Sequence, residues 1–302
     1  MGPAEWAMLC ALSLIWSISY LFNAIALRSF APLTLVALRL SLGAIALWLI
    51  AGAVKYPFPR DPRLWLRFFA MGILNNAIPF SLIVWSQLHI AAGLASVLNA
   101  TTPLFTVLVA HAFLHDEKLS PGRLAGVTFG MAGVAMMVGS DAFAGLDLTV
   151  GAQLAALAAS LSYAFAGVFG RRFSATPPMI TAAGQVTASS FLLIPLALAV
   201  ETPWLSPPPS PEAWAAVAGL AVLCTACAYV LYFTVLRRAG ATNILLVTLL
   251  IPPSAIALGI VFLGERLTVA ELTGLLAIGS GLAMIDGRLL RPLTSLHRKP
   301  GP

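Results

Sequence analysis

Residues 101–119 read TTPLFTVLVAHAFLHDEKL and residues 251–267 read IPPSAIALGIVFLGERL, and these two stretches decide the fold. Each is an apolar run with a proline near its start, and each leads into an acid, a base and a leucine. Pro103 of the first stretch matches Pro252 of the second when the two apolar runs are laid over each other. The chain therefore contains two related halves.

The match continues beyond these stretches. One residue is dropped in the loop of the second copy, and the spacing is constant before and after that point. This many agreements in order are unlikely by chance, even in a chain rich in Ala, Gly and Leu. The matched pairs are Ala92 with Ala241, Phe113 with Phe262, Leu114 with Leu263, Glu117 with Glu265, Lys118 with Arg266, Leu119 with Leu267, Gly126 with Gly274, Gly133 with Gly281, Met136 with Met284 and Gly139 with Gly287.

The composition indicates a membrane protein. Of 302 residues, 60% are hydrophobic and only 9% are charged, whereas an ordinary soluble domain carries about 25% charged residues. A membrane-spanning helix needs about 20 mostly apolar residues, and ten such runs can be counted. The expected spans are Trp6–Ala26, Pro32–Ala53, Leu64–Leu88, Ala91–Leu114, Pro121–Gly139, Leu148–Gly170, Met179–Val200, Ala213–Leu236, Ala241–Leu263 and Val269–Ile285.

Five spans in each half dictate how the halves are related. Because five is odd, the second copy enters the membrane from the side opposite to the first. We therefore expect an all-α integral membrane protein of ten transmembrane helices, arranged as two inverted five-helix repeats, a device typical of transporters. The first repeat would cover residues 1–139 and the second 148–287, with a cytoplasmic tail at 288–302.

The basic residues predict the orientation, because cytoplasmic loops carry the excess of Lys and Arg. With the N-terminus inside, only Arg28 and Arg266 fall in outside loops. Both termini are therefore expected in the cytoplasm, and the protein in a bacterial inner membrane. The basic residues on the inner side are Lys55, Arg60, Arg63, Arg67, Lys118, Arg123, Arg171, Arg172, Arg237, Arg238, Arg288, Arg291, Arg298 and Lys299.

Several other functions are disfavoured. The net charge of +6 is spread between apolar runs rather than gathered on one face, which argues against nucleic-acid binding. Cys224 and Cys227 lie in an apolar run with no nearby His or acid, so we expect helix packing rather than metal or redox chemistry. The spans contain no catalytic constellation. We expect no enzyme activity, no cofactor and no metal, and a monomer or weak homodimer whose partners are a small-molecule substrate and the lipid bilayer.

The motifs resemble a known family. Thr102-Pro103-Leu104-Phe105-Thr106, Asp116-Glu117-Lys118-Leu119 and the Gly126–Gly139 run are similar to the first repeat of the drug/metabolite transporter superfamily, and within it of the EamA-like permeases. Pro252, Gly264-Glu265-Arg266-Leu267 and the glycine-rich last helix repeat that signature, and Ala37-Leu38-Arg39 after Pro32 resembles the family's second helix.

The resemblance implies export or exchange of small metabolites by alternating access, most often amino acids, including aromatic and other neutral ones. It also implies a central cavity lined by the first, third and fourth helices of each repeat. Another substrate class (drug, nucleoside or sugar-type metabolite) stays open, as does a membrane protein without a transport role. Phosphorylated substrates are disfavoured, because no cluster of Lys or Arg lies within the spans.

Arg39 is the one charge well inside an expected span. Burying a cation there costs roughly 2.5–3.5 kcal/mol, so something must compensate it. Arg39 is either an anion contact for a substrate carboxylate or a structural arginine bound to neighbouring helices. No acidic residue lies deep in a span, which favours movement down a substrate gradient over proton coupling through a buried carboxylate.

Polar and aromatic residues on the expected cavity helices complete the candidate site. Asn75 and Asn76 precede Pro79, where a kink is expected, and Asn99 and Thr102 share one helix face. The amides could bind substrate or bond helix to helix, and the aromatics could line the cavity, pack or anchor at the interface. The candidate cavity-lining residues are Trp16, Tyr20, Asn75, Asn76, Trp85, Asn99, Thr102, Tyr163, Tyr229 and Thr248.

Overall fold

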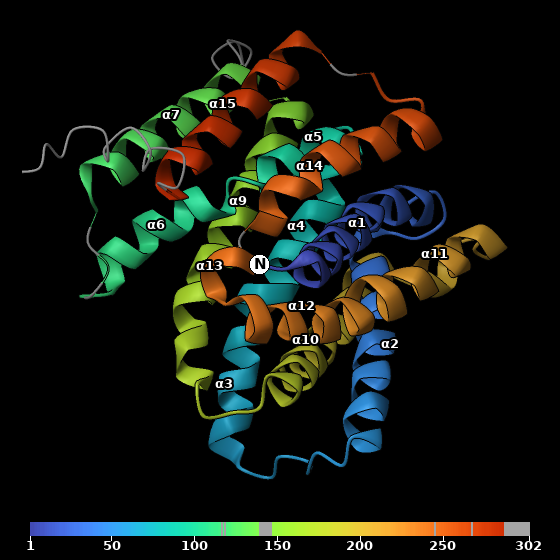
Figure 1. Cartoon of the computed structure of the whole chain (residues 1–302). Helices are drawn as coiled ribbons and strands as arrows, with labels where there is room; N and C mark the ends of the chain where they lie inside the picture. The colour runs from blue at the N-terminus through green and yellow to red at the C-terminus, as the bar shows by residue number, and fades with distance from the viewer. Residues whose placement is uncertain (116, 118, 139–146, 245, 267, 287–302) are drawn as a thin grey trace, which may run out of the picture.

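The computed structural model describes residues 1–115, 117, 119–138, 147–244, 246–266 and 268–286, and all regular secondary structure within these residues is helical (Figure 1). Within them, 9 helices are long and apolar enough to cross a membrane, and Val269–Ile285 forms a shorter apolar helix. The ten expected spans are thus confirmed. Gly139, Gly287 and the expected tail at 288–302 lie outside the described residues.

The first repeat contains five spans, two of which are interrupted. The third span is made of α3, a short π-helix η1 and α4, and the fourth is made of α5 and α6. The elements are α1 (Pro3–Ala26), α2 (Pro32–Ala53), α3 (Pro62–Gly72), η1 (Ile73–Ala77), α4 (Ile78–Ser86), α5 (Ala92–Asn99), α6 (Thr102–Phe113) and α7 (Pro121–Val138).

The second repeat follows the same order, with its own interruptions in the third and fourth spans. Two short 3-10 helices, η2 (Arg171–Phe173) and η3 (Pro203–Leu205), lie in its connections. Its first, second and fifth spans are α9 (Leu148–Gly170), α10 (Pro178–Glu201) and α15 (Val269–Asp286). Its third span consists of α11 (Pro211–Ala221), the π-helix η4 (Val222–Cys227) and α12 (Ala228–Ala239). Its fourth span consists of α13 (Ala241–Ile244), α14 (Leu246–Leu258) and the π-helix η5 (Gly259–Leu263).

Local sequence explains where the helices begin. Proline occupies the first turn of many of them, where its missing N–H costs nothing. Several helices also have a side-chain N-cap: Asp61 accepts from Arg63 N at 2.9 Å, Asp147 from Val150 N and Ser210 from Ala213 N. These caps satisfy backbone donors that helix geometry leaves free.

The packing of the helices follows the inverted repeat. α2 packs against its counterpart α10, and α7 against its counterpart α15, which lie side by side in Figure 1. α1 packs against α14 and α11 of the other repeat, and its counterpart α9 packs against α5, α6 and α4. These main contacts of one repeat are therefore matched by equivalent contacts of the other repeat.

Glycines let α7 and α15 approach closely. A Cβ atom added at Gly126 would lie 2.6 Å from the Gly281 carbonyl oxygen, and one at Gly281 would lie 2.5 Å from that of Gly126. Small residues of this kind allow backbone-to-backbone packing in membranes. The glycine spacing that begins at Gly126 thus serves packing within the chain.

The breaks in the spans fall partly where proline predicts them. Pro103 stands at the junction of α5 and α6, and Pro79 is the second residue of α4, just after η1, whereas Pro195 lies within the continuous helix α10. The π-helices η1 and η4 occupy equivalent places in the third span of each repeat, and η4 contains no proline. Such π-turns are rare in proteins as a whole, and those that occur often lie at functional sites.

Candidate functional site

Arg39 is buried within the helix bundle on α2 and is only 5% exposed. Its Nε donates to Thr225 Oγ1 at 3.1 Å and its Nη1 to Ser19 Oγ at 3.3 Å, while the guanidinium carbon lies 4.2 Å from the centre of the Phe80 ring. Among the described residues, Arg39 has no carboxylate partner, and its Nη2 has no hydrogen-bond acceptor.

These partners stabilise the cation without neutralising it. Two hydroxyl groups and an aromatic face each offer partial compensation, the ring contributing a cation–π interaction of about 0.5–2 kcal/mol. A charge in a low-dielectric interior still attracts an anion strongly. Arg39 is thus hydrogen-bonded to neighbouring helices through two of its guanidinium nitrogens.

An amide cluster lies beside this arginine and joins the two repeats. Asn75 Nδ2 donates to Gln185 Oε1 at 3.2 Å and to the Tyr229 hydroxyl at 3.2 Å. The Tyr229 hydroxyl in turn donates to Asn76 Oδ1 at 3.2 Å, and Asn76 Nδ2 donates to Ser189 Oγ at 3.3 Å. Side chains from η1, α10 and α12 thus form one connected polar network in a region of apolar helices.

The two π-helices position the polar groups. Asn75 and Asn76 come from η1, and Thr225, the partner of Arg39, comes from η4. The wider π-turn displaces side chains from regular α-helical register and alters the backbone hydrogen bonds. Thr225 Oγ1 donates to the Leu220 carbonyl at 2.8 Å and accepts from Arg39, so its hydroxyl links the π-turn to the cation.

Three expected site tyrosines lie in the interior of the bundle. Tyr20 is 6% exposed and directly follows Ser19, a partner of Arg39, whereas Tyr163 and Tyr229 are half-buried. Ser160 donates to Asn99 Oδ1 at 3.4 Å, which ties α9 to the end of α5. Hydrogen bonds join three of the expected site residues directly: Asn75, Asn76 and Tyr229.

The other expected residues lie around this cluster. Trp16 is one turn before Tyr20 on α1 and packs on Tyr232, with ring centres 5.7 Å apart. Trp85 lies near the end of α4 and packs on His89, with ring centres 5.1 Å apart. Thr102 bonds to the Asn99 carbonyl of its own span at 2.7 Å, and Thr248 is half-buried on α14.

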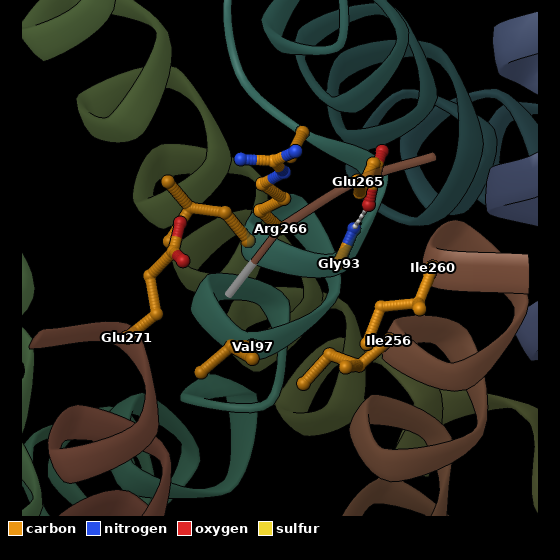
Figure 2. A pocket seen from close by; sticks show the side chains of 9 residues that line it. Gly93, Val97, Ile256, Ile260, Glu265, Arg266 and Glu271 are labelled. Atoms are coloured by element: carbon orange, nitrogen blue, oxygen red, sulfur yellow. Dashed lines mark hydrogen bonds between the residues drawn. The ribbon is translucent and has the colours of Figure 1, made fainter. Parts of the chain in front are cut away.

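A second polar feature closes one end of the bundle between the repeats. The Glu265 carboxylate accepts from Ala92 N at 2.6 Å and from Gly93 N at 3.0 Å, so it caps α5 from across the molecule (Figure 2). Gly259 makes room for it, because a Cβ atom at that position would overlap Oε2. A carboxylate at a helix N-terminus is favoured by both hydrogen bonds and the helix dipole.

The matching acid of the first repeat is engaged differently. Glu117 pairs with Arg171, which lies at the end of α9. α5 packs against α14, whereas α6, the other half of the same span, packs against α9 and α7. The fourth and ninth spans are therefore joined at the end that holds Glu265.

The chain also carries three free cysteines. Cys224 is buried with its Sγ 3.2 Å from the Ile15 carbonyl, and Cys227 is exposed. In the part of the chain that the structure describes, no three His, Cys, Asp or Glu side chains gather as a metal site would require.

The sequence profile of the EamA-like transporter family matches residues 5–139 and again residues 150–286. The chain belongs to this family. Among curated members, the uncharacterized inner membrane transporter YedA of Escherichia coli is 28% identical over 289 residues, which is 94% of this chain and 91% of that protein. The uncharacterized transporter YoaV of Bacillus subtilis is 23% identical, covering 91% and 94% of the two chains.

A further relative carries a more specific name. The probable terminal-alkyne amino-acid exporter of Streptantibioticus cattleyicolor is 25% identical, over 96% of this chain and 95% of that one. A solved crystal structure has a TM-score of 0.67 at 21% identity, covers 95% of this chain and 98% of its own, and supports the fold. This EamA-like protein is thus a multi-pass membrane transporter for a small molecule, not an enzyme.

Four polar residues that bond to Arg39, Asn75 or Asn76 in this EamA-like protein were not predicted from the sequence: Ser19, Gln185, Ser189 and Thr225. The cavity implied by the family resemblance used the first, third and fourth helices of each repeat, whereas Arg39, Gln185 and Ser189 come from the second helices, α2 and α10. The second helix of each repeat must therefore be added to the helices that contribute to this polar cluster. Comparison of the second helices of the two repeats would have found Gln185.

Proposed function

We propose that this transporter exports or exchanges small neutral α-amino acids, aromatic ones included, by alternating access. One observation carries the proposal: among the described residues, the buried Arg39 has only neutral partners and one guanidinium nitrogen without an acceptor, and its partner Thr225 lies on the same span as Tyr229 of the amide network. A carboxylate would complete the coordination of Arg39, and the aromatic rings suit an apolar side chain. The amino-acid exporter among its relatives supports the same class.

The joined and separated ends of the bundle support a transport cycle. We infer that the structure is closed toward the outside, where Glu265 caps α5, and that the cytoplasmic half of the fourth span, α6, packs mainly on α9 and α7. Inverted repeats allow the opposite state to form by exchanging the conformations of the two halves. Substrate would then enter from the cytoplasm and leave when the Glu265 contact opens.

The energy source follows from what surrounds the site. Among the described residues, the acids that bond across the bundle, Glu201 and Glu265, cap helix ends rather than lie beside Arg39. A proton relay through a buried carboxylate is therefore not favoured, and we propose movement down the substrate gradient.

Placement in the cell follows the sequence expectations. We propose a bacterial inner membrane location with both termini cytoplasmic, repeat boundaries at residues 1–139 and 148–287, and a monomer or weak homodimer that binds no nucleic acid. The concentration of Lys and Arg in one set of loops supports the orientation. The use of the α7 and α15 glycine faces within the chain supports the monomer.

Counterflow in proteoliposomes tests the function. Vesicles loaded with an unlabelled neutral amino acid should transiently accumulate the same labelled compound, with saturation and with faster flux when substrate is present on both sides. A linear, unsaturable flux would indicate a channel instead. Counterflow with nucleosides, sugars or drugs but with no amino acid would overturn the substrate class. Accumulation driven by a pH gradient alone would overturn the proposed energy source.

A further inference from the structure

Gln185 occupies in the second repeat the position that Arg39 occupies in the first. The two helices begin PLTLVALR at residues 32–39 and PMITAAGQ at residues 178–185, so each polar residue follows its starting proline at the same spacing. Both side chains are buried, at 5% and 2% exposure, and their helices α2 and α10 pack against each other.

Their contacts obey the same inverted symmetry. Arg39 bonds to Thr225 in the π-helix of the other repeat and lies on Phe80 of its own repeat. Gln185 accepts from Asn75 in the π-helix of the other repeat and lies 3.5 Å from the Tyr229 hydroxyl of its own. Phe80 and Tyr229 are themselves separated by the spacing that relates Pro103 to Pro252.

The two positions carry different chemical groups. At the first position, Arg39 Nη2 is a donor with no acceptor among the residues that the structure describes. At the second, Gln185 and Tyr229 engage the amide nitrogen of Asn75, and no donor among the described residues reaches Asn75 Oδ1. One position therefore offers a cationic donor and the other a neutral acceptor.

The two positions are linked through two spans. Thr225, which bonds to Arg39, and Tyr229, which bonds to Asn75, lie about one helical turn apart on η4 and α12. Phe80, which lies against Arg39, belongs to the same span as Asn75. A substrate beside these two spans can therefore meet both the Arg39 donor and the Asn75 acceptor.

We propose that Arg39 and Asn75 are the two poles of a zwitterion site, in which Arg39 binds the carboxylate of an α-amino acid and Asn75 Oδ1 accepts from its ammonium group. Gln185 is the positioning residue, because its hydrogen bond fixes the orientation of the Asn75 amide. This inference rests on the proposed transport function and adds the orientation of the substrate in the site.

Inhibition of labelled L-phenylalanine exchange in proteoliposomes tests it with three probes. L-phenylalanine carries both charged groups, its methyl ester lacks the carboxylate, and 3-phenylpropionate lacks the ammonium. Arg39→Gln should weaken L-phenylalanine and 3-phenylpropionate about tenfold or more and leave the ester within about twofold, as loss of a charge-assisted hydrogen bond predicts. Residual exchange by each variant supplies the signal.

Gln185 is tested by a matched pair of variants. Gln185→Leu should weaken L-phenylalanine and its ester about tenfold and leave 3-phenylpropionate within about twofold, because the ammonium acceptor loses its orientation. Gln185→Glu retains an oxygen that accepts from Asn75 Nδ2 and should restore binding of the ester, which has no carboxylate for the added negative charge to repel. Equal losses for all three probes in Gln185→Leu, or no rescue by Gln185→Glu, would overturn the positioning role.

Failure of the inference differs from failure of the function. If wild-type vesicles exchange L-phenylalanine but Arg39→Gln weakens the ester as much as the acid, the two-pole arrangement is overturned and transport stands. If wild-type vesicles exchange no amino acid, the proposed function is overturned and this inference with it. Size-exclusion profiles and melting temperatures of the variants show whether each has folded.

Discussion

Replacing Glu265 by Gln should loosen the contact that closes one end of the bundle. The carboxylate accepts from Ala92 N and Gly93 N, whereas a glutamine amide has one oxygen and no charge. Loss of one charge-assisted hydrogen bond costs about 1.5–3 kcal/mol, with a smaller contribution from the helix dipole. The equilibrium between closed and open ends should therefore shift about 10-fold to 150-fold toward the open form.

Hydrogen exchange measured by mass spectrometry follows this change directly. The amides of Ala92 and Gly93 are the donors to Glu265, so the peptide covering residues 91–99 should lose protection by about the same factor. Peptides from α7 and α15, which pack elsewhere in the bundle, should exchange as in the wild type.

A second variant reaches the same contact by a steric route. In Gly259→Ala the added methyl group would overlap Glu265 Oε2 and displace the carboxylate without changing any charge. It should reproduce the faster exchange at residues 91–99. Gly167→Ala is the matched control, since a Cβ atom there meets nothing within 4 Å. Wild-type protection in both Glu265→Gln and Gly259→Ala would refute the reasoning.

Three further variants test the packing and the polar network. Gly281→Ala should reduce stability by about 1–3 kcal/mol, seen as a lower melting temperature in detergent, because its methyl group meets the α7 backbone. Gly279→Ala, with open space around it, should be neutral or stabilising. Equal melting temperatures for the two variants would contradict the close glycine packing of α7 against α15. Glu201→Ala should destabilise by about 2 kcal/mol in thermal melts, because the carboxylate accepts from the first amides of α2 and from Thr34 Oγ1, and an unchanged melt would mean that water replaces this cap. Tyr229→Phe removes the hydroxyl that donates to the amide cluster, so it should reduce the stability measured in thermal melts by about 1–3 kcal/mol and weaken L-phenylalanine exchange. Unchanged exchange would mean that the amide cluster is not part of the substrate site.

Much of the fold could be predicted from sequence, because the bilayer leaves few alternatives for an apolar chain. The run Pro32–Ala53 coincides with α2, and the expected span Leu64–Leu88 corresponds to a helix over Pro62–Ser86. Both are marked by length, apolar composition and a starting proline, which are local signals.

The site was harder to predict, because its contacts join distant segments. Arg39 could be recognised as an unusual charge, yet its partners Ser19 and Thr225 are ordinary polar residues until the fold brings them together. The π-helix η4 carries no proline and gives no local signal. Gln185 lies in an unremarkable polar position, and only the alignment of the second helices of the two repeats singles it out.

The central claim is that one polar site between the inverted repeats opens to both faces of the membrane in turn. It is tested by a single cysteine at Asn99, with Cys10, Cys224 and Cys227 replaced by alanine, in vesicles of known orientation exposed to a membrane-impermeant maleimide. Labelling should occur from either face and should slow when L-phenylalanine is added. Labelling from one face only, whatever the substrate concentration, would contradict the account.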